Sequence, residues 1–121
     1  MKAKYTLKMT RHKNFTSSLF NTPLKSSTPL NEDPDWMVDE FEETVKMSTY
    51  LVAFVVSNFD KISMDSPVNK VLIEVAGRPE AIAKGEGDFA LNEAAEIIDF
   101  FSSYFGIKYP LSKSSKFYLI F

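Results

Sequence analysis

The 121-residue sequence lacks cysteine and contains a single histidine, His12. Without cysteine, the chain can form neither a disulfide framework nor a thiolate nucleophile. Without a second histidine, it cannot build a two-histidine metal site or pair His12 with another imidazole. His12 stands between Arg11 and Lys13, and we predict that its side chain is solvated and not catalytic.

An excess of charge of one sign is also absent. The formal net charge is −2, and acidic and basic residues are mixed along the chain. No basic stripe is available to neutralise phosphates, which argues against nucleic-acid binding, and no basic patch suits a membrane surface.

Long apolar runs are missing as well. The longest, residues 50–56, has seven residues, whereas a membrane-spanning helix needs roughly 20. The first residues alternate charged and apolar side chains and lack the apolar segment of a signal peptide. Nothing in these residues by themselves directs the chain out of the cytosol. With 45% hydrophobic residues, the composition suits a globular chain with one modest core.

What the sequence does contain is period-two alternation, which predicts strands. The predicted strands are residues 2–10, 36–44, 50–56 and 70–76. The first places Ala3, Tyr5, Leu7 and Met9 on one face. In the second, Trp36, Val38 and Glu40 oppose Met37, Asp39 and Phe41. The third is a short run of apolar, β-branched and aromatic residues, typical of a fully covered strand.

The connections between these strands are rich in turn-forming residues. Residues 11–35 contain many serine, threonine, asparagine and proline residues, and predict a long surface connection with at most a short strand near Ser18 to Asn21. Asp65-Ser66-Pro67 and Asn69 predict a hairpin-like connection before the last strand.

After Gly77 the period changes to that of a helix. Pro79 opens a predicted helical turn through Lys84, and Asp88 is the predicted cap of a longer helix that ends near Phe105, before Gly106. One stripe of this helix is apolar: Ala94, Ile97, Ile98, Phe101, Tyr104 and Phe105. The predicted fold is mainly β, with one carboxy-terminal amphipathic α-helix.

Asp39, Glu40, Glu42 and Glu43 form an acidic cluster that offers carboxylate oxygens of the kind calcium binds. Their spacing matches no calcium-binding loop. We therefore predict that the cluster is a solvated strand edge.

Gly85-Glu86-Gly87 precedes the long helix, as the glycines of a phosphate-binding loop do. It lacks a third glycine and a Lys-Ser/Thr ending, and Glu86 would repel phosphate, so we predict a turn between two helices. Asn14-Phe15-Thr16 is an N-glycosylation sequon, which would be used only if the segment reached the secretory lumen. Asn14 is therefore the candidate glycosylation site.

The aromatic part of the helical stripe, Phe100, Phe101, Tyr104 and Phe105, has the composition of a ligand cage or a docking face. A stripe with this spacing more often faces the core, provided that the chain supplies a matching surface. We predict the core-facing arrangement only on that condition, and a chain without the matching surface would leave Ile97, Ile98 and Phe101 uncovered.

Several segments carry a family resemblance. They are S-T-P-L-N-E-D-P-D-W at 27–36, F-E-E-T at 41–44, K-M-S-T-Y-L at 46–51, R-P at 78–79, G-D-F-A-L-N at 87–92 and Y-P-L at 109–111, followed by Lys113. This collinear set resembles the aminopeptidase N-like zinc aminopeptidases, which are gluzincin metallopeptidases. Val45 replaces the proline usual before the Lys-Met-Ser-Thr-Tyr run, a local change.

The resemblance implies a partial β-sandwich or saddle. Residues 1–86 are expected to be the second half of the amino-terminal β-domain of such an enzyme, and residues 87–113 the first helix of its thermolysin-like catalytic domain. Residues 114–121 depart from the family pattern and are expected to be a divergent tail.

The resemblance also implies a parent enzyme that uses zinc to remove amino-terminal residues from peptides, typically as a plasma-membrane ectoenzyme. This sequence contains neither H-E-x-x-H nor G-A-M-E-N, so no catalytic, cofactor-binding or metal-binding residue is assigned to it. The chain is expected to be a fragment that supplies scaffold and is inactive alone. Its expected partner is the remainder of the aminopeptidase. The alternative is a truncated module that binds or interferes with the full-length enzyme through exposed strand edges.

Overall fold

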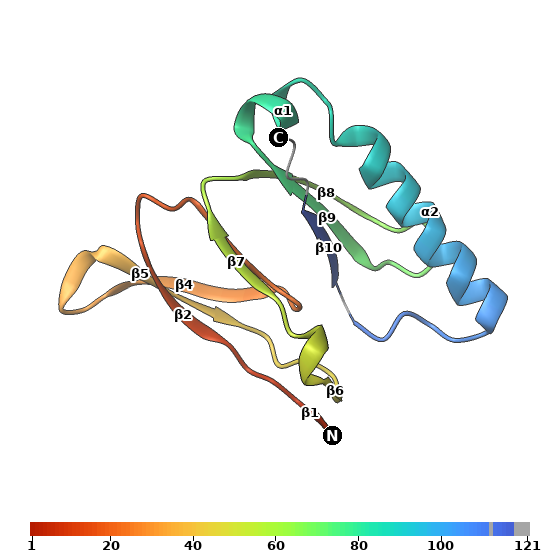
Figure 1. Cartoon of the computed structure of the whole chain (residues 1–121), viewed down its shortest axis with the longest axis horizontal. Coiled ribbons are helices and arrows are strands. Elements are labelled where there is room, and N and C mark those ends of the chain that lie inside the picture. The colour runs from red at the N-terminus through yellow and green to blue at the C-terminus, as the bar shows by residue number, and fades with distance from the viewer. Residues whose placement is uncertain (112, 118–121) are drawn as a thin grey trace. The chain divides into compact units, whose positions relative to one another are not determined.

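The computed structural model describes residues 1–111 and 113–117 (Figure 1). The chain divides into two compact units, residues 1–58 and residues 59–121. Strands dominate, and one substantial helix lies in the second unit, so the predicted fold class is confirmed.

The first unit is built from antiparallel strand pairs. Its three-stranded sheet contains, in spatial order, β2 (Lys8–His12), β5 (Asp33–Phe41) and β4 (Leu24–Leu30). Two further pairs join β1 (Lys2–Ala3) to β6 (Met47–Ser48) and β3 (Ser17–Phe20) to β7 (Phe54–Ser57). A short 3-10 helix, η1 (Thr49–Leu51), separates β6 from β7. The buried apolar side chains of this unit are Leu19, Phe20, Phe41 and Met47.

The predicted strand over residues 2–10 has the expected faces but two partners. Ala3, Tyr5, Leu7 and Met9 are half-buried, and the residues between them are exposed. The chain pairs first with β6 and then, from Lys8, with β5. Between these pairings, the backbone oxygen of Leu7 accepts from Phe41 N–H at 3.0 Å. The alternation therefore continues while the hydrogen-bonding partner changes.

The prediction for residues 11–35 was incomplete. The short strand near Ser18 is present as β3, but β4, a seven-residue strand, was not predicted. Almost all of β4 is exposed, because it is an edge strand of its sheet and carries polar side chains and Pro29. Edge strands tolerate proline and need no apolar face, so the hydrophobic pattern gave no signal.

The strand predicted at residues 50–56 is present only over its last three residues, which belong to β7, and the segment is not fully covered. Tyr50 is 85% exposed and Phe54 is 62% exposed, and the first two residues of the segment belong to η1. The Asn21 side chain fixes this irregular path, because its amide nitrogen donates to Leu51 O at 3.0 Å and its amide oxygen accepts from Ala53 N–H at 2.9 Å. A side chain 30 residues away thus binds the backbone just before β7, where the apolar run suggested strand pairing.

The second unit is a three-stranded sheet with helices between two of its strands. Its strands are β8 (Asp60–Asp65), β9 (Leu72–Gly77) and β10 (Lys113–Phe117), with β9 in the middle. β9 is antiparallel to β8 and parallel to β10. The helices are α1 (Pro79–Ala83) and α2 (Asp88–Phe105), and Figure 1 shows α2 running alongside the sheet. The core consists of Val71, Ile73, Val75, Ala90, Leu91, Ala94 and Ala95.

The hairpin-like connection predicted near Ser66 is confirmed, since β8 and β9 pair across it. The strand β8 before it was not predicted. The strand predicted at 70–76 is present as β9, but it is buried on both faces, as expected of a central strand with a parallel neighbour.

The helix boundaries agree closely with the prediction, but the cap does not. Gly87 occupies the N-cap without a side-chain hydrogen bond. Asp88 lies in the first turn, where its negative charge interacts favourably with the helix dipole. Gly106 ends α2 in the left-handed conformation, with φ of 64°. Gly85 also has positive φ, which confirms the predicted turn between the helices.

The predicted divergent tail, residues 114–121, is described only in part. Its residues 114–117 form most of β10, a strand that was not predicted. Residues 118–121 lie outside the described residues.

Candidate functional site

The residues singled out in the sequence do not converge on one site. His12 is half-buried, and its ring meets the Trp36 ring edge-on, with centroids 5.4 Å apart. Its Nδ1 atom accepts from Asn14 N–H at 3.2 Å. These contacts place His12 in the support of a turn, so the prediction of a solvated side chain holds only in part.

The acidic cluster is divided between the two faces of the strand and the turn after it. Glu40 lies near two lysines, 3.5 Å from Lys8 Nζ and 3.6 Å from Lys25 Nζ, and Glu43 pairs with Lys4 at 2.7 Å. Asp39 points the other way and is completely buried. The predicted solvated edge is therefore wrong for Asp39. Among residues 1–111 and 113–117, no group of three or more acidic, histidine or cysteine side chains is placed to hold a metal ion.

Asp39 connects four strands of the first unit. Its carboxylate on β5 accepts from Arg11 Nε of β2 at 2.5 Å and from Ser27 Oγ of β4 at 2.5 Å. Ser18 Oγ of β3 donates to the same carboxylate. Burial raises the pKa of Asp39, but the hydrogen bonds from Arg11, Ser18 and Ser27 outweigh this effect and hold the pKa below its ordinary value. Both oxygens are occupied, so this carboxylate serves structure and is not free to act as a base.

A second buried ion pair joins strands of the second unit. Lys113 Nζ of β10 lies 2.6 Å from Glu74 Oε2 of β9, and only 3% and 8% of the two side chains are exposed. Lys61 on β8 approaches the other oxygen of Glu74 at 3.4 Å. Glu74 thus contacts a lysine from each neighbouring strand, and its single negative charge is compensated by two positive charges.

Asp99 on α2 holds the turn between β8 and β9. Its carboxylate accepts from Val68 N–H at 2.8 Å, from Asn69 N–H at 3.0 Å and from the Asn69 side-chain amide at 2.7 Å. Burial acts to raise the pKa of Asp99, but these hydrogen bonds and one from Ser66 lower it to about 2. Sequence reasoning missed this residue because its partners lie some 30 positions away.

The exposed feature of the second unit is the carboxy-terminal half of α2. Its aromatic side chains are largely uncovered, with Tyr104 70% and Phe105 64% exposed. Phe100 stacks on Tyr104 and Phe101 on Phe105, with ring centroids 5.9 and 5.8 Å apart. We call Phe100, Phe101, Tyr104 and Phe105 the aromatic face. Within the described residues, the condition for a core-facing stripe is therefore not met.

The lengths of the elements explain this exposure. An 18-residue helix is about 27 Å long, whereas a six-residue strand spans about 20 Å. The first turns of α2 pack on β8 and β9 with Ala90, Leu91 and Ala94, and no buried core residue among the described ones comes from the last turns. The stripe is continuous, but the sheet beneath it is shorter.

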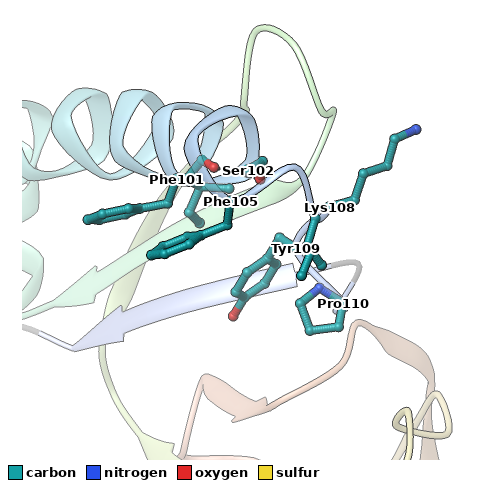
Figure 2. Close-up of a pocket in the computed structure, with 8 residues that line it drawn as sticks. Phe101, Ser102, Phe105, Lys108, Tyr109 and Pro110 are labelled. Carbon is teal, nitrogen blue, oxygen red and sulfur yellow. Dashed lines mark hydrogen bonds between the residues drawn. The ribbon is translucent and has the colours of Figure 1, made fainter.

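An open apolar groove adjoins the aromatic face. It has a volume of about 370 Å³ and is lined by Ile98, Phe101, Ser102, Phe105, Ile107, Lys108, Tyr109 and Pro110. Figure 2 shows the rings of Phe101 and Phe105 projecting from α2 toward the side where Tyr109 lies, while Lys108 points away. Its lining suits an apolar protein segment better than a reacting substrate, because it offers no acidic group and only one basic side chain.

Comparison with known proteins defines the class of the chain. Residues 1–51, which contain β1 to β6 and η1, match the Peptidase M1 N-terminal domain. The chain is 46% identical over 116 residues to aminopeptidase N of Homo sapiens and 44% identical over the same length to aminopeptidase N of Oryctolagus cuniculus. It is 40% identical over 117 residues to aminopeptidase Ey of Gallus gallus. Each of these alignments covers 96% of this chain.

The chain is an aminopeptidase N-like segment of the M1 peptidase family, which confirms the resemblance seen in its motifs. It spans 12% of the length of these relatives. Within the part of the chain that the structure describes, no helix is long and apolar enough to cross a membrane.

Proposed function

We propose that the chain is a scaffold segment of a zinc-dependent aminopeptidase that removes amino-terminal residues from peptides. The observation that carries this proposal is the identity of 46% with human aminopeptidase N, which extends through both compact units. The alignment includes residues 87–113, which we assign to the start of the catalytic domain. Peptides would be substrates of the whole enzyme, and its typical location would be the plasma membrane.

Zinc in such an enzyme would be held by residues outside this chain. The carboxylates of Asp39, Glu74 and Asp99 do not fit a zinc site. Asp39 and Glu74 form buried ion pairs, and Asp99 accepts hydrogen bonds from a turn. Zinc sites in proteins need three or four convergent side chains. The contribution of this segment is therefore structural, and we expect the isolated chain to be inactive.

The aromatic face supports the assignment of a partner. Four clustered aromatic side chains at the end of a helix are a costly surface to leave in water, because each buried phenylalanine contributes about 1.5–3 kcal/mol. We assign this face to contact with the remainder of the aminopeptidase chain.

A segment exchange tests the proposal. Residues 1–113 would replace the aligned segment of human aminopeptidase N. The measurement is the release of the amino-terminal residue from an amide substrate. We expect the chimera to retain activity and the 121-residue chain with added zinc to show none. A secreted, folded chimera without activity, or zinc-dependent hydrolysis by the chain alone, would contradict the proposal.

A second candidate function is a non-catalytic module that binds the full-length enzyme. The exposed aromatic face favours it, since the same surface would be available to a separate aminopeptidase molecule. Co-purification of the tagged chain with full-length enzyme, together with lowered enzyme activity, is the expected result. Recovery of the chain alone from cells that contain the enzyme would rule out this candidate.

A further inference from the structure

Asn14 lies in a turn at the end of β2, held by backbone contacts on both sides. Phe15 N–H donates to His12 O at 3.0 Å, which closes the turn. Lys13 N–H donates to Asp35 O at 2.8 Å, which anchors the turn to β5. The turn therefore does not depend on the Asn14 side chain.

The Asn14 side chain is exposed and uncommitted. Within the described residues, the only hydrogen bond of Asn14 is the one from its backbone N–H to His12. Asn21 provides the contrast in the same unit, because both atoms of its carboxamide are bound to the backbone of Leu51 and Ala53. Of these two amides, only that of Asn14 is free to react.

The residues after Asn14 complete the requirement for N-glycosylation. Thr16 supplies the hydroxyl two positions later, and Phe15 between them is not proline. Phe15 and Thr16 are both exposed. The sequon, the exposed turn and the unused carboxamide are independent observations that agree on one acceptor.

We propose that Asn14 is an acceptor for an N-linked oligosaccharide, a modification that goes beyond the scaffold role. The donor is an oligosaccharide carried on a lipid diphosphate. A bond forms between Asn14 Nδ2 and the anomeric carbon of the first sugar, and the bond from that carbon to the diphosphate oxygen breaks. The amide nitrogen gives up one proton, and the lipid diphosphate leaves.

The test is to express the full 121-residue chain behind a cleavable signal peptide in mammalian cells. A second version carries an additional reporter sequon after the last residue, which reports that the chain reached the lumen. Occupancy is read as a gel shift removed by peptide:N-glycosidase. When peptide:N-glycosidase removes the glycan in heavy-oxygen water, it converts Asn14 to an aspartate that carries the heavy oxygen. Peptide mass spectrometry then locates this label at position 14.

Three substitutions control the assignment. We expect one glycan in the wild-type chain and in Thr16→Ser, which keeps the hydroxyl. We expect no glycan in Asn14→Gln or in Thr16→Val, which preserves the shape of threonine and removes its hydroxyl. An unmodified Asn14 in a chain whose reporter sequon is occupied would overturn the proposal. This readout involves no peptidase activity, so its failure is distinct from failure of the scaffold proposal.

Discussion

At the residue scale, the first unit depends on one carboxylate. Asp39 receives hydrogen bonds from Arg11, Ser18 and Ser27, which lie on three other strands. A buried carboxylate is stabilised only while its charge remains compensated, and removal of one partner leaves the other charge unpaired in a medium of low polarity. The contacts around Asp39 should therefore matter more than the exposed ion pairs of the same sheets.

Loss of the Arg11 charge should destabilise the first unit strongly. Arg11→Met keeps much of the side-chain length and leaves Asp39 buried without its cation, a change that typically costs about 3–5 kcal/mol. The measurement is urea unfolding followed by fluorescence of Trp36, the only tryptophan. The matched control is Lys4→Met, which breaks the exposed pair with Glu43 and should have little effect. Equal unfolding midpoints for the two variants would show that Asp39 is not the central connection.

Asp99 should make the second unit sensitive to acid. Because its pKa is lowered to about 2 in the folded chain, its contribution to the free energy of unfolding is complete above the ordinary value of 3.8. That contribution is lost as the pH falls from about 4 through about 2. In Asp99→Asn this loss should be absent, and the variant should be less stable than wild type at pH 7.

The pH dependence can be followed through the helical circular dichroism signal during urea unfolding at several pH values. Glu96→Gln is the control, because Glu96 lies on the same helix, is exposed, and its side chain makes no hydrogen bond or ion pair among the described residues. A wild-type curve that coincides with Asp99→Asn from pH 7 to pH 2 would contradict the assigned role.

Asp39 also shows which residue-scale features the sequence could predict. The period of two placed it on the same face as Phe41, and both are buried. Its charge predicted an exposed side chain instead. The sequence around Asp39 does not reveal its partners, because the covering strand β3 and Arg11 belong to other parts of the chain. The face of a side chain follows from local geometry, whereas its burial depends on what packs against that face.

At the scale of elements, the two glycines that flank α2 are needed for different reasons. Gly106 has positive φ, but nothing lies within 4 Å of an added Cβ atom. Gly87 has ordinary φ, but an added Cβ atom would lie 3.0 Å from Ile62 Cδ1. The first position requires a backbone conformation, and the second requires space.

Alanine substitutions should separate these two causes. Gly106→Ala should cost about 1 kcal/mol through backbone strain alone. Gly87→Ala should cost about 1–3 kcal/mol through overpacking. Ile62→Val removes Cδ1, the atom nearest to the new Cβ atom. It should therefore recover part of the stability lost in Gly87→Ala and none of the stability lost in Gly106→Ala.

Double-mutant cycles from urea unfolding measure this difference. A coupling of Ile62→Val to Gly87→Ala that equals its coupling to Gly106→Ala would refute the steric explanation.

The elements that the sequence predicted well are those with strong local signals. The start of α1 follows from Pro79, the ends of α2 follow from the flanking glycines and the helical period, and β9 follows from its β-branched residues. The strands β4, β8 and β10 were missed because their order comes from pairing with neighbours and not from an apolar pattern of their own. The segment at 50–56 had such a pattern, but only its last three residues form a strand, because the Asn21 side chain binds the backbone of Leu51 and Ala53.

At the scale of the whole molecule, the sequence predicted the composition of the aromatic face and left its environment conditional on a matching surface. The sequence indicated the stripe, but whether it is covered depends on the number of residues in the strands beneath it. Motif resemblance supplied the family, which the comparisons confirm. The division at residues 86 and 113 stays a prediction.

The scaffold proposal predicts that one double substitution in the aromatic face has opposite effects in two contexts. It should improve the behaviour of the isolated chain and harm the whole enzyme. In the isolated chain, Phe101 and Phe105 are exposed and favour self-association, so replacing both by serine should lower aggregation measured by light scattering. In the segment-exchange chimera, the same pair would lie against the remainder of the enzyme. There the double substitution should reduce the yield of folded enzyme and its thermal stability.

Phe89 provides the control for this test, since it is 76% exposed at the opposite end of the same helix. Phe89→Ser removes a similar apolar area without touching the aromatic face or the groove. It should therefore leave the chimera largely unaffected. If Phe101→Ser with Phe105→Ser leaves the chimera as stable as Phe89→Ser does, the aromatic face is not the contact with the remainder of the enzyme. Loss of stability confined to the Phe101 and Phe105 pair, together with reduced aggregation of the isolated chain, would assign that contact to the last turns of α2.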